Sequence, residues 1–293
     1  MPHGKARFKT TKYKTMREKT DNISIRGYSH ILADKECQDF SISWGTREYS
    51  AIIVCDGHGG EKYIRSSVGS KIACEVGKTA IDDFMRSIKK TDCDYIKSQL
   101  PNLERFIVQK WRENVTEHFE NNPFDLYARY MALSDSDRQA LDKNPVKAYG
   151  STFIAAVLTD NLYFIIKLGD GNVNVIHSDG TIDSPQELTD DQLQFNVTTS
   201  LCQSNAFDEF KHTVKAFDRK SSVRSVVLTT DGIINCFQSV EAYRSLIKNI
   251  FDAYNEARNE IEISKARKEL ESALNEFSQK GSGDDLSVAI MIR

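Results

Sequence analysis

The apolar residues of this chain follow two kinds of spacing, one typical of β-strands and one typical of helices. Short segments rich in β-branched and aromatic residues, with a spacing close to two, predict strands. They lie near the start and in the second half of the chain, at residues 22–32, 39–44, 48–56, 151–159, 161–170, 173–178, 222–231 and 286–293.

Helical spacing fills the intervals between these groups of strands. It is clearest over residues 61–78, and it continues through 81–141 and again through 238–280. The order strands, helices, strands, helices, strand is not the regular alternation of a parallel doubly wound fold. The pattern predicts an α+β protein in which antiparallel sheets carry helices on their outer faces.

A basic segment precedes the first predicted strand. The first 20 residues contain seven Lys or Arg and one Glu. Such charge blocks are usually solvated and flexible, and a docking arm for an acidic partner is the alternative. With five prolines and no linker rich in Gly, Ser or Pro, the chain divides into a flexible tail at 1–21 and one domain at 22–293.

Composition excludes several other classes of protein. The net charge of −3 and the pI of about 6.1 point to neither nucleic acid nor an anionic membrane surface. The apolar runs are too short to span a bilayer, and the start lacks the apolar core of a secretory signal. Six scattered cysteines without a CxxC pair indicate reduced thiols. We therefore expect a cytoplasmic monomer.

Three predicted strands end or begin at an aspartate beside a glycine. These are Asp56, Asp231 and Asp284. One Asp-Gly pair is usually a turn, but three carboxylates at buried strand ends need a charged partner. Few Lys or Arg lie beside them in the sequence. Mg²⁺ and Mn²⁺ prefer carboxylate, carbonyl and water oxygens, so the pattern predicts a divalent metal site.

These residues and their order resemble the metal-dependent protein Ser/Thr phosphatases of the PP2C (PPM) family, in its bacterial-type branch. The resemblance covers about residues 23–292. It is carried by Gln38-Asp39 before a strand, DGHGG at 56–60, GST at 150–152, GD at 169–170, TDG at 230–232 and DDLS at 284–287. The DGHGG motif alone is only moderately specific for this family. The whole set of motifs in the family's order is strong evidence for the resemblance.

The resemblance implies a four-layer sandwich of two packed antiparallel sheets between helices. It also implies a phosphatase that hydrolyses phosphoserine and phosphothreonine in phosphorylated proteins, with two Mg²⁺ or Mn²⁺ ions and a third, weaker one. The matching positions make these residues its metal ligands: Asp56 as the bridging ligand, the Gly57 carbonyl, Asp231, Asp284, Asp39 through ordered water, and Asp170 for the third ion.

In such enzymes a water held between the two metals attacks phosphorus in line. The leaving alkoxide needs a proton, and His58 matches the family's general acid. An isolated histidine is more often structural than catalytic, so we expect a mainly structural role for His30, His118, His177 and His212.

The chain departs from the family at three places near this site. The position of a common phosphate-binding Arg is Asp34, which would repel phosphate, so His30 or Arg26 is the predicted phosphate contact. Gln38 replaces a Glu and keeps an oxygen for a metal-bound water. Asp285 replaces a common Asn and adds a negative charge.

Two further segments are bulky or variable. Residues 178–212 coincide with the family's substrate-selecting flap, and the helical block at 81–141 is expected to serve packing. Two other functions remain open. One is a phosphatase-like regulatory or binding module with little turnover, and the other is a hydrolase of small phosphoesters. Retention of the predicted acidic ligands favours the protein phosphatase.

Overall fold

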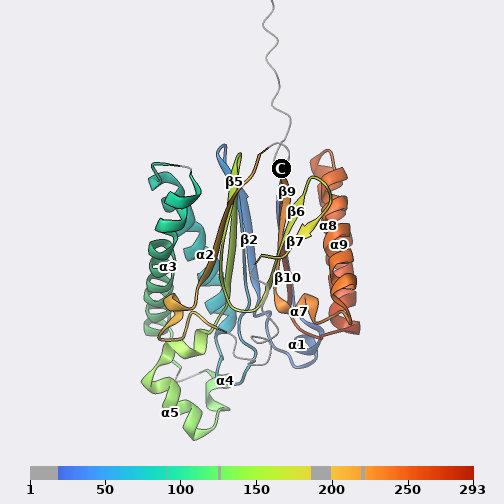
Figure 1. Cartoon of the computed structure of the whole chain (residues 1–293). Coiled ribbons are helices and arrows are strands. Elements are labelled where there is room, and N and C mark those ends of the chain that lie inside the picture. The colour runs from blue at the N-terminus through green and yellow to red at the C-terminus, as the bar shows by residue number, and fades with distance from the viewer. Residues whose placement is uncertain (1–18, 91, 125–126, 186–198, 219–221) are drawn as a thin grey trace, which may run out of the picture.

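The architecture consists of two β-sheets packed face to face, with helices on both outer faces (Figure 1). The computed structural model describes residues 19–90, 92–124, 127–185, 199–218 and 222–293. Residues 1–18 of the predicted tail lie outside this range, and the first strand begins at Lys19. The four layers confirm the predicted α+β sandwich.

Each sheet has five strands, and every pairing between named strands is antiparallel. One sheet has the order β2 (Phe40–Gly45), β3 (Tyr49–Cys55), β4 (Phe153–Thr159), β5 (Leu162–Leu168) and β8 (Lys211–Ala216). The other has the order β1 (Lys19–Ile25), β10 (Leu286–Ile292), β9 (Val223–Thr229), β6 (Asn172–His177) and β7 (Ile182–Asp183). The first and last strands of the domain are therefore neighbours.

The long helices form the outer layers. These are α2 (Ser66–Ser87) and α3 (Cys93–Asn121) on one side, and α8 (Val240–Glu256) and α9 (Glu260–Lys280) on the other (Figure 1). The shorter helices are α1 (Tyr28–Leu32), α4 (Ala128–Met131), α5 (Asp135–Lys143), α7 (Asp231–Ile234), η1 (Pro145–Tyr149) and η2 (Ala206–Asp208). No helix in the described ranges has the length and apolarity that a membrane crossing requires.

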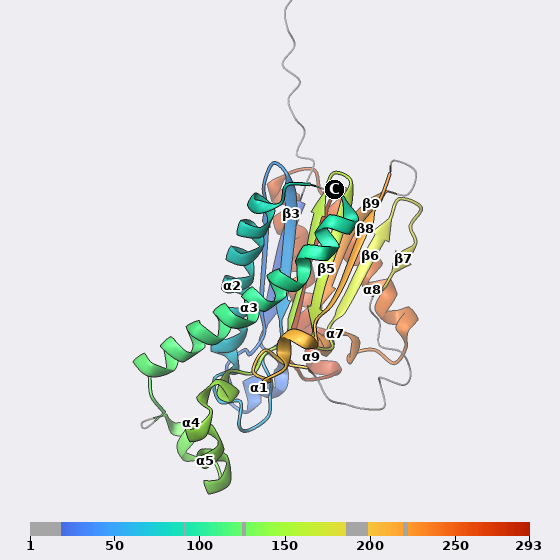
Figure 2. The same cartoon turned by 60° about the vertical axis from the view of Figure 1, so that its left-hand side comes forward.

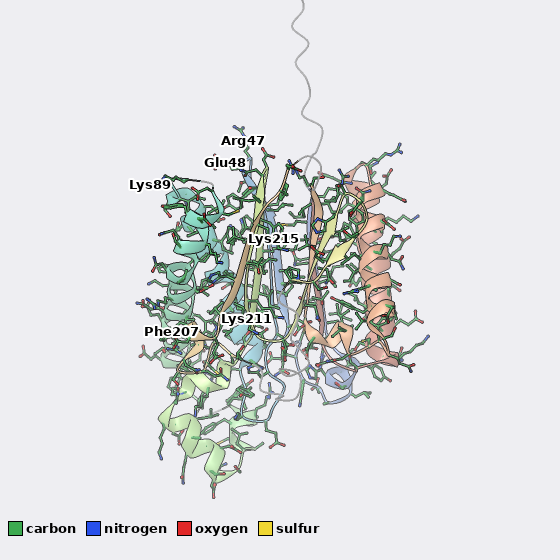
Figure 3. The ribbon with its side chains drawn as sticks, viewed as in Figure 1. Arg47, Glu48, Lys89, Phe207, Lys211 and Lys215 are labelled. Carbon is green, nitrogen blue, oxygen red and sulfur yellow. The ribbon has the colours of Figure 1, made fainter. Side chains whose placement is uncertain are left out.

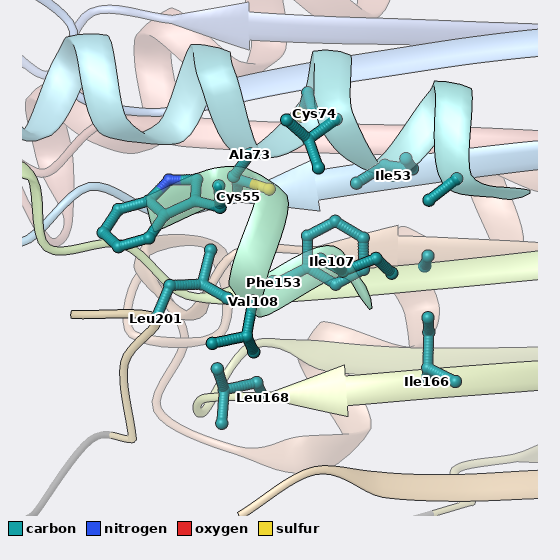
Figure 4. Packing of buried hydrophobic residues seen from close by; sticks show 14 of the residues in the cluster. Ile53, Cys55, Ala73, Cys74, Ile107, Val108, Phe153, Ile166, Leu168 and Leu201 are labelled. Atoms are coloured by element: carbon teal, nitrogen blue, oxygen red, sulfur yellow. The ribbon is translucent and has the colours of Figure 1, made fainter. Parts of the chain in front are cut away.

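Alternation along the inner strands creates a separate hydrophobic core between each pair of layers. In β3, Ile53 and Cys55 face α2 and α3 (Figure 4), whereas Ile52 and Val54 face the opposite sheet. A third cluster joins the second sheet to α8 and α9. Because both faces of β3 are covered, all seven of its residues are buried.

One predicted strand is wrong in its second half. Residues 22–32 were expected to form one strand, but β1 ends at Ile25 and α1 begins at Tyr28. Between them, the backbone of Gly27 packs against Asp284 and Asp285 more closely than any Cβ would allow. The Ser29 N–H then donates to the Gly283 carbonyl at 2.9 Å. These contacts with the distant β10 approach turn the chain into a helix.

The strand ends that carry the predicted site motifs lie at one end of the sandwich, beside α1 and α7 (Figure 1). At this end α4 and α5 extend beyond the end of α3, which Figure 2 shows from a second direction. Arg47, Glu48 and Lys89 mark the opposite end (Figure 3). Of the predicted flap, residues 186–198 lie outside the described ranges, and the rest includes β7, η2 and the start of β8.

Candidate active site

The loop after β3 places Asp56 at the end of a fully buried strand. Thr152 fixes its backbone twice. The Asp56 N–H donates to Thr152 Oγ1 at 2.9 Å, and the Thr152 N–H donates to the Asp56 carbonyl at 2.8 Å. The next residue, Gly57, packs against the backbone of Gln38 and Ser66, where no side chain could fit. The DGHGG turn is thus held by its neighbours before any ligand binds.

A second aspartate meets Asp56 from the other sheet. Asp231 is the first residue of α7, directly after β9. Each carboxyl group contributes to the shift in the pKa of the other, so the two acids lie close together and do not readily ionise at the same time without a cation. Burial, followed by the charges of Asp39 and Asp231, raises the pKa of Asp56 well above its ordinary value. Burial and the Asp170 charge raise the pKa of Asp231.

Asp39 and Asp284 complete the acidic cluster. Asp39 is 5% exposed, and Thr230 Oγ1 donates to its Oδ2 at 2.7 Å. Burial and the charge of Asp285 raise the pKa of Asp39 well above the ordinary range. Asp284 lies at the exposed rim, yet the surrounding protein still desolvates its carboxyl and raises its pKa, with a further contribution from Asp285.

These carboxyl groups have the chemistry of a divalent metal site, although their geometry is not that of a closed one. Within the described ranges, no group of three or more His, Cys, Asp or Glu side chains is arranged as a ready metal cage. Two observations nevertheless fit a hard cation. The acids raise one another's pKa by repulsion, and the buried Gln38 Oε1 has no hydrogen-bond partner.

His58 lies beside this cluster. The backbone N–H of His58 donates to the Gly150 carbonyl at 3.1 Å. Its imidazole ring packs edge-on against the Tyr63 ring, with 4.7 Å between the ring centroids. Burial lowers the pKa of His58, Asp170 opposes this shift, and Lys62 adds to it. The Asp170 charge acts on the His58 imidazole as well as on the Asp231 carboxyl, so Asp170 lies within electrostatic range of both groups.

The predicted phosphate contacts, His30 and Arg26, have partners within the protein. His30 is 9% exposed, and its Nδ1 lies 2.9 Å from Asp285 Oδ2, off the axis of a directed hydrogen bond. Arg26 donates to the His30 carbonyl at 3.1 Å and contacts Asp34 at 3.4 Å. These contacts weigh against the predicted role, and Asp34 itself points into solvent.

Several residues that were not predicted as part of the site hold the acids in place. Thr152 fixes the backbone of Asp56, while Thr230 and Ser287 link β9 to β10 and orient Asp39. All three hydroxyl residues lie within the quoted motifs. The sequence feature that could have identified them is a hydroxyl residue at the end of a predicted buried strand, because a buried carboxylate there needs hydrogen-bond donors.

The sequence itself settles the family. The family model described as Protein phosphatase 2C matches residues 26–275. The chain belongs to the protein phosphatase 2C family. The match includes all of the site residues described above except Asp284, Asp285 and Ser287. The comparison with curated protein sequences gave no match.

Solved structures show that the phosphatase 2C fold extends over nearly the whole chain. PppA, a key regulatory component of T6SS in Pseudomonas aeruginosa, is 13% identical with a TM-score of 0.57, covering 95% of this chain and 98% of its own. A bacterial serine phosphatase is 14% identical with a TM-score of 0.56, over 93% and 96%. Serine/threonine phosphatase Stp1 from Staphylococcus aureus is 14% identical with a TM-score of 0.55, over 95% and 96%.

Proposed function

We propose that this phosphatase 2C family member is an active, Mg²⁺- or Mn²⁺-dependent phosphatase of phosphoserine and phosphothreonine in proteins. The observation that carries the proposal is the meeting of Asp56 and Asp231. They follow strands of different sheets, and each carboxyl group affects the pKa of the other within a site that holds three more acids. A regulatory relative without turnover would have no need to maintain this repulsion.

The residues that would hold the ions are those of the acidic cluster. Asp56, the Gly57 carbonyl, Asp231 and Asp284 would hold two divalent ions, and Asp39 would act through ordered water. Asp170 would hold a third, weaker ion. Bound divalent ions would neutralise phosphoryl oxygens and lower the pKa of a coordinated water. Thr152, Thr230 and Ser287 keep the carboxylates oriented for this task.

His58 would supply the proton that the leaving alkoxide needs. His58 lies two residues after Asp56 in the DGHGG turn. Imidazole is the side chain best matched to proton transfer near neutral pH, and His58 would act in its protonated form. Tyr63 packs against the ring and limits its orientations.

The test is hydrolysis of a phosphothreonine peptide with Mn²⁺, compared with the same reaction in excess EDTA. We expect release of inorganic phosphate only with the metal. A small aryl phosphate serves as a second substrate. Hydrolysis of the aryl phosphate alone would indicate a small-phosphoester hydrolase, and no hydrolysis of either would indicate a binding module.

A further inference from the structure

The exposed side of the site next to His58 carries two lysines from different segments. Lys62 follows the DGHGG turn, and Lys147 is part of η1. Both side chains are exposed. They are relevant because the predicted phosphate contacts, His30 and Arg26, face Asp285 and Asp34 within the protein.

A short series of contacts connects Lys62 to the catalytic imidazole. Its Nζ lies 5.1 Å from the centroid of the Tyr63 ring, and the Tyr63 ring lies 4.7 Å from that of His58. The Tyr63 N–H donates to the Gly60 carbonyl at 2.9 Å, which closes the turn that holds Lys62. The ammonium group is therefore held on the same turn as the DGHGG motif.

Lys147 approaches the same region from η1. The Gly150 N–H donates to the Lys147 carbonyl at 3.4 Å, and the Gly150 carbonyl accepts from the His58 N–H. Gly150 itself packs so closely on the His58 and Tyr63 rings that a Cβ there would clash with both. The end of η1, which carries Lys147, and the turn that carries Lys62 therefore meet at these two rings.

We propose that Lys62 and Lys147 form a cationic rim that selects phosphorylated segments with acidic residues next to the phosphorylated side chain. This inference rests on the proposed phosphatase function and names the substrate class of the same site. A flanking Asp or Glu would meet an ammonium group on the His58 side while the phosphate occupies the acidic cluster. Glu61, exposed on the same turn, is the neighbouring charge that opposes this preference.

The experiment compares three phosphothreonine peptides that differ only in flanking residues, which are acidic, neutral or basic. With Mn²⁺ at low ionic strength, we expect kcat/KM for the acidic peptide to exceed that for the basic one about 3- to 10-fold. The difference should lie mainly in KM, because flanking contacts are the same in ground and transition states. It should shrink at high salt.

Charge changes on the rim identify the lysines responsible. Lys62→Glu and Lys147→Glu should each lower or invert the acidic-to-basic ratio, Lys62→Arg should keep it, and Glu61→Lys should raise it. The matched control is Lys89→Glu, at the opposite end of the sandwich (Figure 3), which should leave the ratio unchanged. A ratio near one in the unmodified protein, or an equal change in Lys89→Glu, would overturn the proposal.

A binding measurement separates this inference from the proposed function. Fluorescence anisotropy of the three labelled peptides needs no turnover, and the acidic peptide should bind most tightly. Equal binding of all three would overturn the cationic rim whether or not hydrolysis occurs. Hydrolysis without discrimination would overturn the rim alone, and discrimination in binding without hydrolysis would overturn the phosphatase alone.

Discussion

His30 and Asp285 lie together beneath the acidic cluster, with His30 Nδ1 2.9 Å from Asp285 Oδ2. The same carboxylate accepts from the backbone N–H groups of Gly27 at 2.5 Å and Gln38 at 2.6 Å. Asp285 is 3% exposed, so these contacts are its compensation for burial. Asp285 thus joins the segment after β1 to the start of β10.

Asp285→Asn should destabilise the protein. The amide would keep one acceptor and turn its NH₂ group toward a backbone N–H. Leaving one buried donor unpaired costs about 1–3 kcal/mol. Urea unfolding without metal measures this loss, and Asp34→Asn, on a fully exposed side chain, is the control with about 0.5 kcal/mol or less. Equal unfolding midpoints would contradict the role of Asp285.

The acidic cluster should make stability and metal binding depend on pH in opposite directions. In the folded protein the pKa values of Asp39, Asp56, Asp231 and Asp284 are raised above the ordinary 3.8. Folding therefore gains from their protonation below about pH 3.8, and this gain is lost as the pH rises through the higher folded values.

Mn²⁺ binds the ionised carboxylates, so its stabilising effect should grow as the protons leave. We expect the increase in Tm on adding Mn²⁺ to be larger at pH 8 than at pH 5.5. Thermal unfolding with Mn²⁺ and with EDTA at both pH values measures it. Asp231→Asn should reduce the increase at both. An increase that is the same at the two pH values would argue against binding to these acids.

His58→Ala should separate two substrates. Loss of the general acid should lower kcat on a phosphothreonine peptide by about 100-fold or more, because the alkoxide leaves poorly without a proton. An aryl phosphate, whose leaving group is a stable anion, should lose much less. The comparison is made at saturating Mn²⁺. Similar losses on both substrates would assign His58 to positioning of the site instead.

The sequence predicted the layers and the acids because both depend on local patterns. The strand spacing before Asp56 corresponds to β3, and the helical spacing after it corresponds to α2. Asp56 and Asp231 lie at strand ends, as their motifs predicted. Residues 28–32 were missed because their structure depends on Gly27 packing against Asp284, which is distant in sequence.

The edge strand β8 was missed for a different reason. Lys211–Ala216 is half-exposed and begins within the segment assigned to a flap, so its alternation is weak. Its place is set by pairing with β5 and by Glu104 on α3, which accepts from His212 Nδ1 at 2.9 Å. His212 thus has a structural contact between β8 and α3. The local sequence does not reveal this contact, because the two residues are far apart in the chain.

The most direct measurement is phosphate release from a phosphothreonine peptide by the unmodified protein and by Asp56→Asn, each titrated with Mn²⁺. The acidic cluster around Asp56 and Asp231 predicts saturable, EDTA-sensitive turnover in the unmodified protein. The folded Asp56→Asn protein should have no Mn²⁺-dependent turnover above background. Turnover in Asp56→Asn near that of the unmodified protein at saturating Mn²⁺ would contradict the assignment of this cluster as the catalytic metal site.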